Sequence, residues 1–143
     1  MFAALGLAEG SEVTVLERLQ YADGLYIGHL RNHLPYDLLC PEPLNPYGSL
    51  GSVGLYGLMR AAGVFACTAQ HAIGARAATA EECDLLDVAE GSALLTLTRT
   101  TFNQSGRPVE YSNHSYPSSR RGFEFQLIFG GAAVLRLQDV YRK

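Results

Sequence analysis

The stretch 93–117, ALLTLTRTTFNQSGRPVEYSNHSYP, decides the fold of this chain. Two runs rich in β-branched and aromatic residues flank a polar segment that holds Gly106 and Pro108. This pattern predicts a β-hairpin with a loop longer than two residues. Side chains alternate between the two faces of a strand. The residues that we expect on one face of the second strand are Glu110, Ser112, His114 and Tyr116. That face is either exposed to solvent or one wall of a polar pocket.

A second hairpin is expected upstream, at residues 12–34. Residues 12–21 have strand composition, Asp23-Gly24 is a tight-turn signal, and residues 25–34 return as a strand that Pro35 ends. Each hairpin carries an Arg in its first strand, a Gly in its turn and a Pro eleven residues after that Gly. The matching pairs are Arg18 and Arg99, Gly24 and Gly106, and Pro35 and Pro117. This spacing suggests two related halves in one sheet.

The segments between and after the hairpins are expected to form a loop, two helices and two further strands. Residues 36–48 hold three prolines and predict a loop. A helix is expected from a cap at Ser49 or Ser52 to Gly63, because apolar residues recur at helical spacing. Residues 64–78 predict a weaker strand.

Thr79 and Glu82 have the spacing of a capping box, which predicts a short helix to about Asp87. Residues 123–128 predict a last strand, and the tail 132–143 fits either a strand or a helix. The sum is an α+β fold with a largely antiparallel sheet and flanking helices.

The composition indicates one globular domain over residues 1–143. Hydrophobic residues make up 48% and charged residues 17%, which excludes a disordered chain. The net charge of −3 argues against direct DNA binding, which requires clustered Lys and Arg. No apolar run has the length of a membrane span, and the first residues lack the basic start of a secretory signal. Cys40, Cys67 and Cys83 have no close pairing and are typical of buried thiols in a reducing cytoplasm.

The sequence shows no catalytic or metal-binding constellation, so we expect no catalytic residue, no metal and no cofactor. His29 and His33 share a face of the predicted strand but lie too far apart along it to chelate one ion. The charged run 81–84 predicts a solvated helix face. What remains is Arg18, Arg99 and Glu110 with two tyrosines. Such a set suits the orientation of a small polar ligand, and a buried ion pair or a solvated face explains it equally well.

The order of several sequence blocks is similar to that of a known family. The blocks are LGLAEGSEV (5–13), LERLQYADG (16–24), HLP (33–35), GLY (54–56), LTRTTF (97–102) and GRPVEYS (106–112). They resemble the UTRA domain, the effector-sensing domain of the HutC-type branch of the GntR transcription regulators. The resemblance implies a chorismate-lyase-like α+β fold, a small-molecule pocket and a homodimer. It also implies a winged helix-turn-helix ahead of the sensor, so the chain resembles a UTRA domain truncated at its N-terminus.

The resemblance also implies which residues bind the effector. Arg18, Tyr56, Glu110 and Tyr116 match pocket positions of the family, and Arg99 joins them by its place in the second hairpin. Three positions depart from the family pattern, each with the loss of a polar contact: Gln20, Leu30 and Gly54. These departures disfavour the phosphosugar ligands of some relatives, but the choice among sugars and their phosphates, histidine-pathway metabolites, phosphonates and fatty acids remains open.

Two functions follow as alternatives. The first is an effector-sensing, dimerising module of a bacterial, cytoplasmic transcription regulator, which reaches DNA through a separate N-terminal domain. The second is a chorismate-lyase-like enzyme acting on a small carboxylate. We favour the sensor, because binding needs only orienting groups whereas catalysis needs a positioned acid or base. Under the sensor hypothesis Glu110→Gln weakens effector binding, whereas a buried pair of Glu110 with Arg18 predicts a loss of stability instead.

Overall fold

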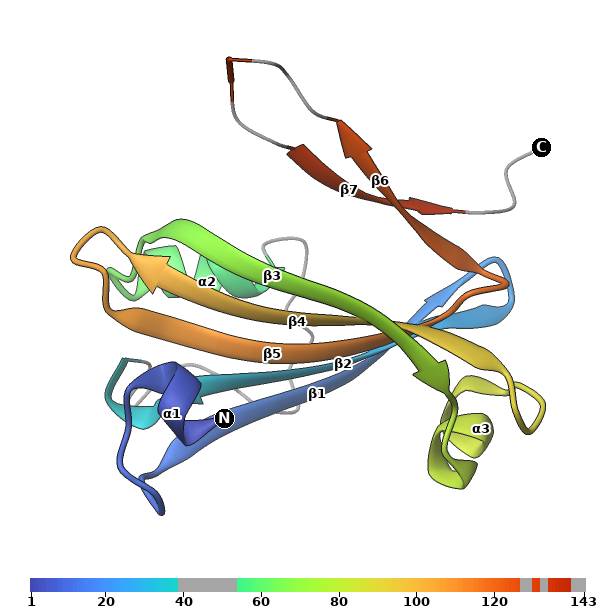
Figure 1. The fold of residues 1–143 in the computed structure, drawn as a ribbon. Helices are drawn as coiled ribbons and strands as arrows, with labels where there is room; N and C mark the ends of the chain where they lie inside the picture. Colours follow the sequence, from blue (N-terminus) through green and yellow to red (C-terminus); the bar gives the residue numbers. More distant parts are fainter. Residues whose placement is uncertain (39–53, 127–129, 132–133, 140–143) are drawn as a thin grey trace. The chain divides into compact units, whose positions relative to one another are not determined.

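The computed structural model describes residues 1–38, 54–126, 130–131 and 134–139, and shows an α+β chain with two sheets (Figure 1). The larger sheet is antiparallel and has the strand order β1-β2-β5-β4-β3. Its strands are β1 (Val13–Ala22), β2 (Leu25–Pro35), β3 (Ala66–Ala77), β4 (Ala93–Asn103) and β5 (Pro108–Pro117). The other elements are α1 (Phe2–Leu5), the 3-10 helix η1 (Tyr36–Leu38), α2 (Gly54–Ala61), α3 (Ala80–Leu86), β6 (Arg121–Gln126) and β7 (Val134–Asp139). The expected α+β fold is confirmed.

Both predicted hairpins form, and their second strands are neighbours in the sheet. Asp23 and Gly24 have φ values of 51° and 81°, the left-handed conformation that a two-residue hairpin turn requires. In the other hairpin the Asn103 side chain accepts hydrogen bonds from the backbone N–H groups of Ser105 and Arg107. Because β2 lies beside β5, polar residues from the two hairpins come together on one sheet face.

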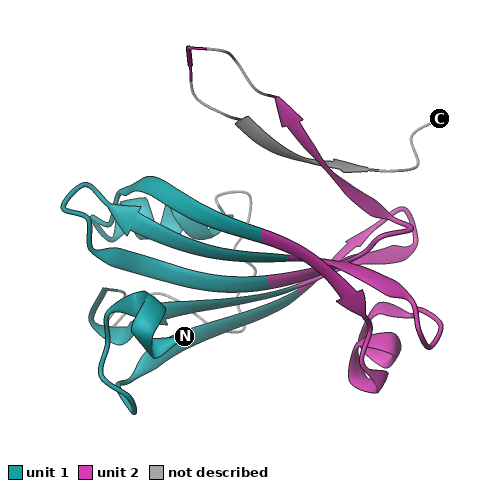
Figure 2. Ribbon diagram, in the orientation of Figure 1, with its two compact units in different colours: residues 1–18, 30–72, 97–113 teal, residues 19–29, 73–96, 114–143 magenta. Residues whose placement is uncertain are grey.

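Contacts along the chain define two compact units, shown in teal and magenta in Figure 2. Unit 1 comprises residues 1–18, 30–72 and 97–113, and unit 2 comprises residues 19–29, 73–96 and 114–143. Each unit is described below by itself.

The core of unit 1 forms where α2 packs behind the sheet (Figure 1). Leu55 and Met59 lie one helical turn apart and are 6% and 1% exposed. They pack against three strand residues, Leu16, Leu34 and Val109. The helix ends before Gly63, whose φ of 81° suits the residue after a C-terminus. Ser49 and Ser52, the predicted caps, lie outside the described residues.

Unit 2 contains the predicted capping box. The Thr79 hydroxyl accepts from the Glu82 N–H, and the Glu82 carboxylate accepts from the Thr79 N–H, at the start of α3. The expectation of a solvated charged run is wrong at Glu82, which is 8% exposed, because its carboxylate also accepts two hydrogen bonds from the Arg76 guanidinium at 2.6 and 2.7 Å. Leu86 is fully buried below it.

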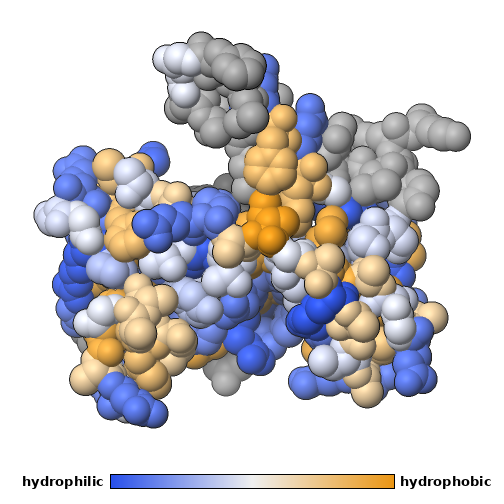
Figure 3. Space-filling view, viewed as in Figure 1, coloured by the Kyte–Doolittle hydropathy of each residue, from blue (hydrophilic) through white to orange (hydrophobic). Residues whose placement is uncertain are grey.

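Strand β3 is one of the two edge strands of the larger sheet, and all twelve of its residues are exposed. The expectation of buried thiols is therefore wrong for Cys67, which lies on this strand, and Cys83 is of intermediate burial. Cys40 lies outside the described residues. In Figure 3 a few strongly hydrophobic side chains lie among polar ones on the visible face.

The ends of the chain add two elements. The short helix α1 is absent from the sequence-based expectations. The ambiguous tail forms a strand, β7, which pairs antiparallel with β6 from Arg121 opposite Asp139 to Gln126 opposite Val134. None of the described helices is long and apolar enough to cross a membrane.

Candidate functional site

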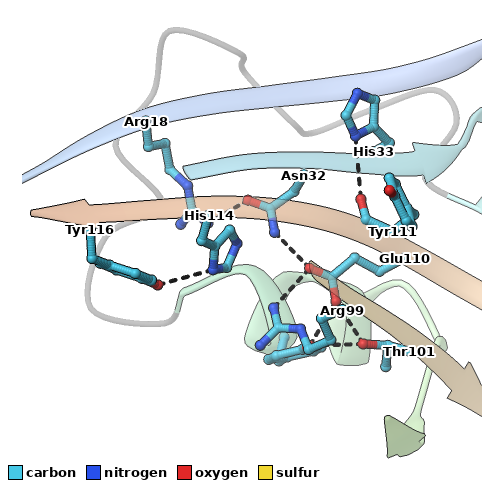
Figure 4. Close-up of polar contacts among 10 residues, drawn as sticks. Arg18, Asn32, His33, Arg99, Thr101, Glu110, Tyr111, His114 and Tyr116 are labelled. Atoms are coloured by element: carbon cyan, nitrogen blue, oxygen red, sulfur yellow. Dashed lines mark hydrogen bonds and ion pairs between the residues drawn. The ribbon is translucent and has the colours of Figure 1, made fainter. Parts of the chain in front are cut away.

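A buried carboxylate, Glu110 on β5, is the centre of the polar cluster in unit 1 (Figure 4). Its side chain has no exposed surface and accepts four hydrogen bonds. The donors are Asn32 Nδ2 at 2.6 Å and Arg99 at 2.9 Å to Oε1, and the Tyr56 hydroxyl at 2.7 Å and the Thr101 hydroxyl at 2.8 Å to Oε2. Both carboxylate oxygens are thus paired, as burial of a charge requires.

Strand alternation explains how the sequence assembles this cluster. Arg99 and Thr101 are two residues apart on β4, so their side chains point to the same face as Glu110 on the neighbouring strand. Asn32 approaches from β2 on the other side of β5, and α2 brings Tyr56 over the same face. Three elements therefore supply donors to one carboxylate, which lies on a fourth.

A second guanidinium joins the cluster through Asn32. Arg18 on β1 donates a hydrogen bond of 2.8 Å to Asn32 Oδ1, while the amide nitrogen of Asn32 donates to Glu110. In Figure 4 the three side chains form a line from β1 to β5. The Arg99 guanidinium also lies over the Tyr56 ring, 5.2 Å from its centre, in cation–π geometry.

The cluster keeps Glu110 ionised and Tyr56 protonated. Burial alone would raise the pKa of the Glu110 carboxyl, but the Arg99 charge and the hydrogen bonds from Arg99, Tyr56 and Thr101 lower it below its ordinary value. Burial, together with the negative charge of Glu110, raises the pKa of the Tyr56 hydroxyl to about 12. Tyr56 is therefore a hydrogen-bond donor at neutral pH.

Known proteins similar to this chain indicate its family. The sequence pattern that defines the UTRA domain matches residues 1–121. The chain belongs to the UTRA family. A search of curated protein sequences found no match.

Solved structures of similar chains place this UTRA domain among transcription regulators. One is a candidate transcriptional regulator from Streptomyces coelicolor, 41% identical, with a TM-score of 0.75 over 95% of this chain and 81% of that chain. Another is a GntR-family transcriptional regulator from Enterococcus faecalis, 26% identical, with a TM-score of 0.72 over 89% and 88% of the two chains. A third is the effector domain of PhnF from Mycobacterium smegmatis, 25% identical, with a TM-score of 0.71 over 82% and 71%.

The chain is therefore an effector-binding domain of a GntR-type transcription regulator. None of the comparisons supports the alternative of a chorismate-lyase-like enzyme.

Four of the five residues predicted to bind the effector lie together in this UTRA domain: Arg18, Tyr56, Arg99 and Glu110. The buried pair that was expected as an alternative does form, but its cation is Arg99 rather than Arg18. Arg18 reaches the carboxylate only through the amide of Asn32.

Tyr116, the fifth predicted residue, belongs to unit 2. Its ring is 1% exposed and packs edge-on against Phe123, and its hydroxyl lies 3.0 Å from His114 Nδ1. The ring also lies directly over the backbone of Gly28 on β2, where a Cβ would come within 2.8 Å of two of its carbons. These contacts give Tyr116 a packing role in unit 2.

Sequence reasoning missed Asn32 and Thr101, although both had a signal. Thr101 is two residues after Arg99 and so shares its face. Asn32 is a polar residue that shares a strand face with Leu30 and Leu34. Of the positions that depart from the family pattern, Leu30 is 6% exposed and Gly54 opens α2 with a φ of 67°. Among the described residues no group of three or more His, Cys, Asp or Glu is placed to hold a metal ion.

Proposed function

We propose that this UTRA domain binds a small anionic metabolite on the sheet face around Glu110, and that Arg18, Arg99 and Tyr56 contact it. The observation that carries the proposal is the buried carboxylate with four hydrogen-bond donors. Such a carboxylate is too well paired to bind a ligand itself. Its role is to hold the Arg99 guanidinium and the Tyr56 hydroxyl in one orientation, which reduces the entropy cost of binding.

The charge of the cluster supports an anionic ligand. Arg18 and Arg99 each carry a positive charge, and the lowered pKa of Glu110 supplies one negative charge. A guanidinium group binds a carboxylate or a phosphate through two parallel hydrogen bonds, so two guanidinium groups close to one sheet face favour an anionic ligand. The Arg99 side chain keeps 18% of its surface exposed, so a ligand can reach it.

The same electrostatics support a sensor rather than an enzyme. A carboxyl group that acts as a general acid or base at neutral pH has a pKa that its surroundings raise toward 7. The surroundings of Glu110 act in the opposite direction and lower its pKa. A permanently ionised, fully hydrogen-bonded carboxylate suits ligand orientation.

The effector would act on transcription through a separate DNA-binding segment. We infer that this UTRA domain works with a winged helix-turn-helix of the HutC branch, in the bacterial cytoplasm. The net charge of −3 supports a division of labour in which another domain contacts the phosphates of DNA.

A homodimer is part of the same proposal. The exposed edge of β3 carries twelve residues with only one charged side chain, Arg76, and unprotected edges of this kind pair readily with a second chain. Sedimentation at high micromolar concentration is expected to show a dimer, and a clean monomer would contradict this part of the proposal.

The effector site is tested by a thermal-shift screen of anionic metabolites against the wild-type chain and Arg18→Gln. A ligand that binds only the folded state at 100 times its dissociation constant adds about 2.7 kcal/mol to the free energy of unfolding. We expect Arg18→Gln to abolish most of the shift that an anionic hit produces.

The matched control is Arg31→Gln, also in unit 1. Arg31 is 48% exposed and pairs with exposed Glu17 at 2.8 Å, so its removal changes the net charge equally without touching the cluster. A hit whose shift survives Arg18→Gln, or falls equally with Arg31→Gln, would refute the assignment.

A further inference from the structure

A cavity of about 360 Å³ opens in unit 1 between the C-terminal half of α2 and the first residues of β3. Its volume lies at the lower end of the range for small-molecule sites, roughly 300 to 1,000 Å³. Four apolar residues contribute to its lining: Val64, Phe65, Ala66 and Ala69. Phe65 is a large aromatic residue and is 50% exposed, so its ring offers apolar surface to a molecule in the cavity.

The cavity has one charged lining residue, Arg60 in the last turn of α2. The lining contains no Asp or Glu, and the described residues give Arg60 no ion-pair partner. A single cation at the rim of an apolar cavity is complementary to a small molecule with an apolar body and one carboxylate, because Arg binds a carboxylate through two parallel hydrogen bonds.

The back of the cavity is formed by Tyr56 and Thr101, whose hydroxyls are 3.1 Å apart. Both hydroxyls donate to the same oxygen of Glu110. A molecule in the cavity would therefore contact two of the four residues that donate hydrogen bonds to the Glu110 carboxylate.

We propose that this cavity is a second ligand site, which takes a small amphipathic carboxylate with a flat apolar body and anchors it on Arg60. The site goes beyond the effector site proposed above, since its anchor is Arg60 beside the β3 edge, whereas the effector site uses Arg18 and Arg99. The two sites share Tyr56, so occupation of one changes the affinity of the other, and by linkage the effect is reciprocal.

The exposed thiol of Cys67 lies in the cavity lining and provides a local reporter. The experiment measures the alkylation rate of Cys67 by peptide mass mapping, with and without 3-phenylpropanoate, and uses Cys83 in the same chain as the control thiol. We expect 3-phenylpropanoate to slow alkylation of Cys67 severalfold and to leave Cys83 unchanged. The amine of the same shape, 3-phenylpropylamine, is expected to give no protection.

Two variants test the anchor and the cavity. Arg60→Gln is expected to weaken protection by 3-phenylpropanoate about three- to tenfold, as for one partly exposed charge-assisted contact, while Arg31→Gln leaves it unchanged. Ala69→Leu places three more carbons in the cavity from an exposed strand position and is expected to abolish protection.

Equal protection by the amine, unchanged protection in Arg60→Gln, or no protection by 3-phenylpropanoate would overturn the proposal. A probe that raises the melting temperature but leaves the Cys67 rate unchanged binds elsewhere, and this result also overturns the cavity site while the effector site stands. The opposite outcome is also informative. If Arg60 is needed for protection of Cys67, and anionic metabolites give the same thermal shift in Arg18→Gln as in the wild-type chain, the cavity site is supported and the effector site is refuted.

Discussion

Glu110 in unit 1 and Glu82 in unit 2 are both buried glutamates whose negative charge must be paired, and the two differ in where their partners come from. Each carboxylate pairs with a guanidinium, Arg99 for Glu110 and Arg76 for Glu82, and each has its remaining oxygen sites filled by other donors. The main partners of Glu82 are local, since Thr79 is three residues away and Arg76 is six, and Ser115 on β5 is a weaker partner from a distant part of the sequence. The partners of Glu110 are 9, 11, 54 and 78 residues away in sequence.

The distance in sequence between a glutamate and its partners distinguishes Glu82, which has a structural role, from Glu110, which is a candidate for function. The local network around Glu82 caps one helix and uses an Arg that is 45% exposed, so it depends on few other parts of unit 2. The network around Glu110 joins four secondary-structure elements and has no exposed carboxylate surface. A ligand that moves Tyr56 would therefore act on α2, the helix that packs on the sheet. This makes the Glu110 network suited to transmit a binding event.

The largest expected effect is that of Glu110→Ala. Removal of the buried carboxylate takes away the acceptor that the partly buried Arg99 and three further donors share, and breaking a buried pair in this way costs about 3 to 5 kcal/mol. The free energy of unfolding by urea titration measures the loss. A loss in the free energy of unfolding no greater than that from Glu82→Ala would contradict the distinction drawn between the two glutamates.

An intermediate effect is expected from Glu82→Gln, with a pH signature. The hydrogen bond from Arg76 lowers the pKa of the Glu82 carboxyl to about 2, from an ordinary value of 4.5. Because the pKa is lower in the folded chain, the ionised group stabilises the fold above pH 4.5, and this contribution is lost as the pH falls toward about 2.

We therefore expect Glu82→Gln to cost about 2 kcal/mol at neutral pH and to reduce the acid sensitivity between pH 4.5 and 2. Melting curves across this range measure both quantities. Glu81→Gln is the matched control, since Glu81 occupies the same helix turn and is exposed. An equal change in both variants would attribute the effect to the helix dipole rather than to the Arg76 pair.

The smallest effect is expected from Tyr56→Phe, which removes one of four donors and leaves the ring under Arg99. Glu110 then keeps three donors, so the loss of stability is about 1 kcal/mol. Equilibrium unfolding measures this value, and the same variant should weaken binding of an anionic effector. A loss as large as that from Glu110→Ala would show that the network acts as one unit rather than as separable bonds.

The same contrast explains how much the sequence could predict. The capping box of α3, the turn at Asp23-Gly24 and the two hairpins depend on neighbouring residues, and their patterns predicted them correctly. Strand alternation also placed Glu110 and Ser112 on one face, and both are fully buried.

Local sequence patterns could not predict the contacts between strands that are distant in the sequence. The choice of Arg99 rather than Arg18 as the partner of Glu110 depends on strand order, because β4 is next to β5 whereas β1 is separated from β5 by β2. The burial of Glu82 was missed because its counter-charge, Arg76, lies in a strand before the capping box rather than within the helix. Both errors arise where tertiary neighbours, and not local patterns, determine the environment of a charge.

The ring of Tyr116 over Gly28 has a consequence for the evolution of the family. A methyl group at position 28 would overlap the ring at 2.8 Å, and the neighbour that must yield is a fully buried aromatic side chain. The two positions are therefore not free to drift independently. A lineage that gains a side chain at position 28 must first accept a smaller residue at position 116, so the pair should covary across homologues.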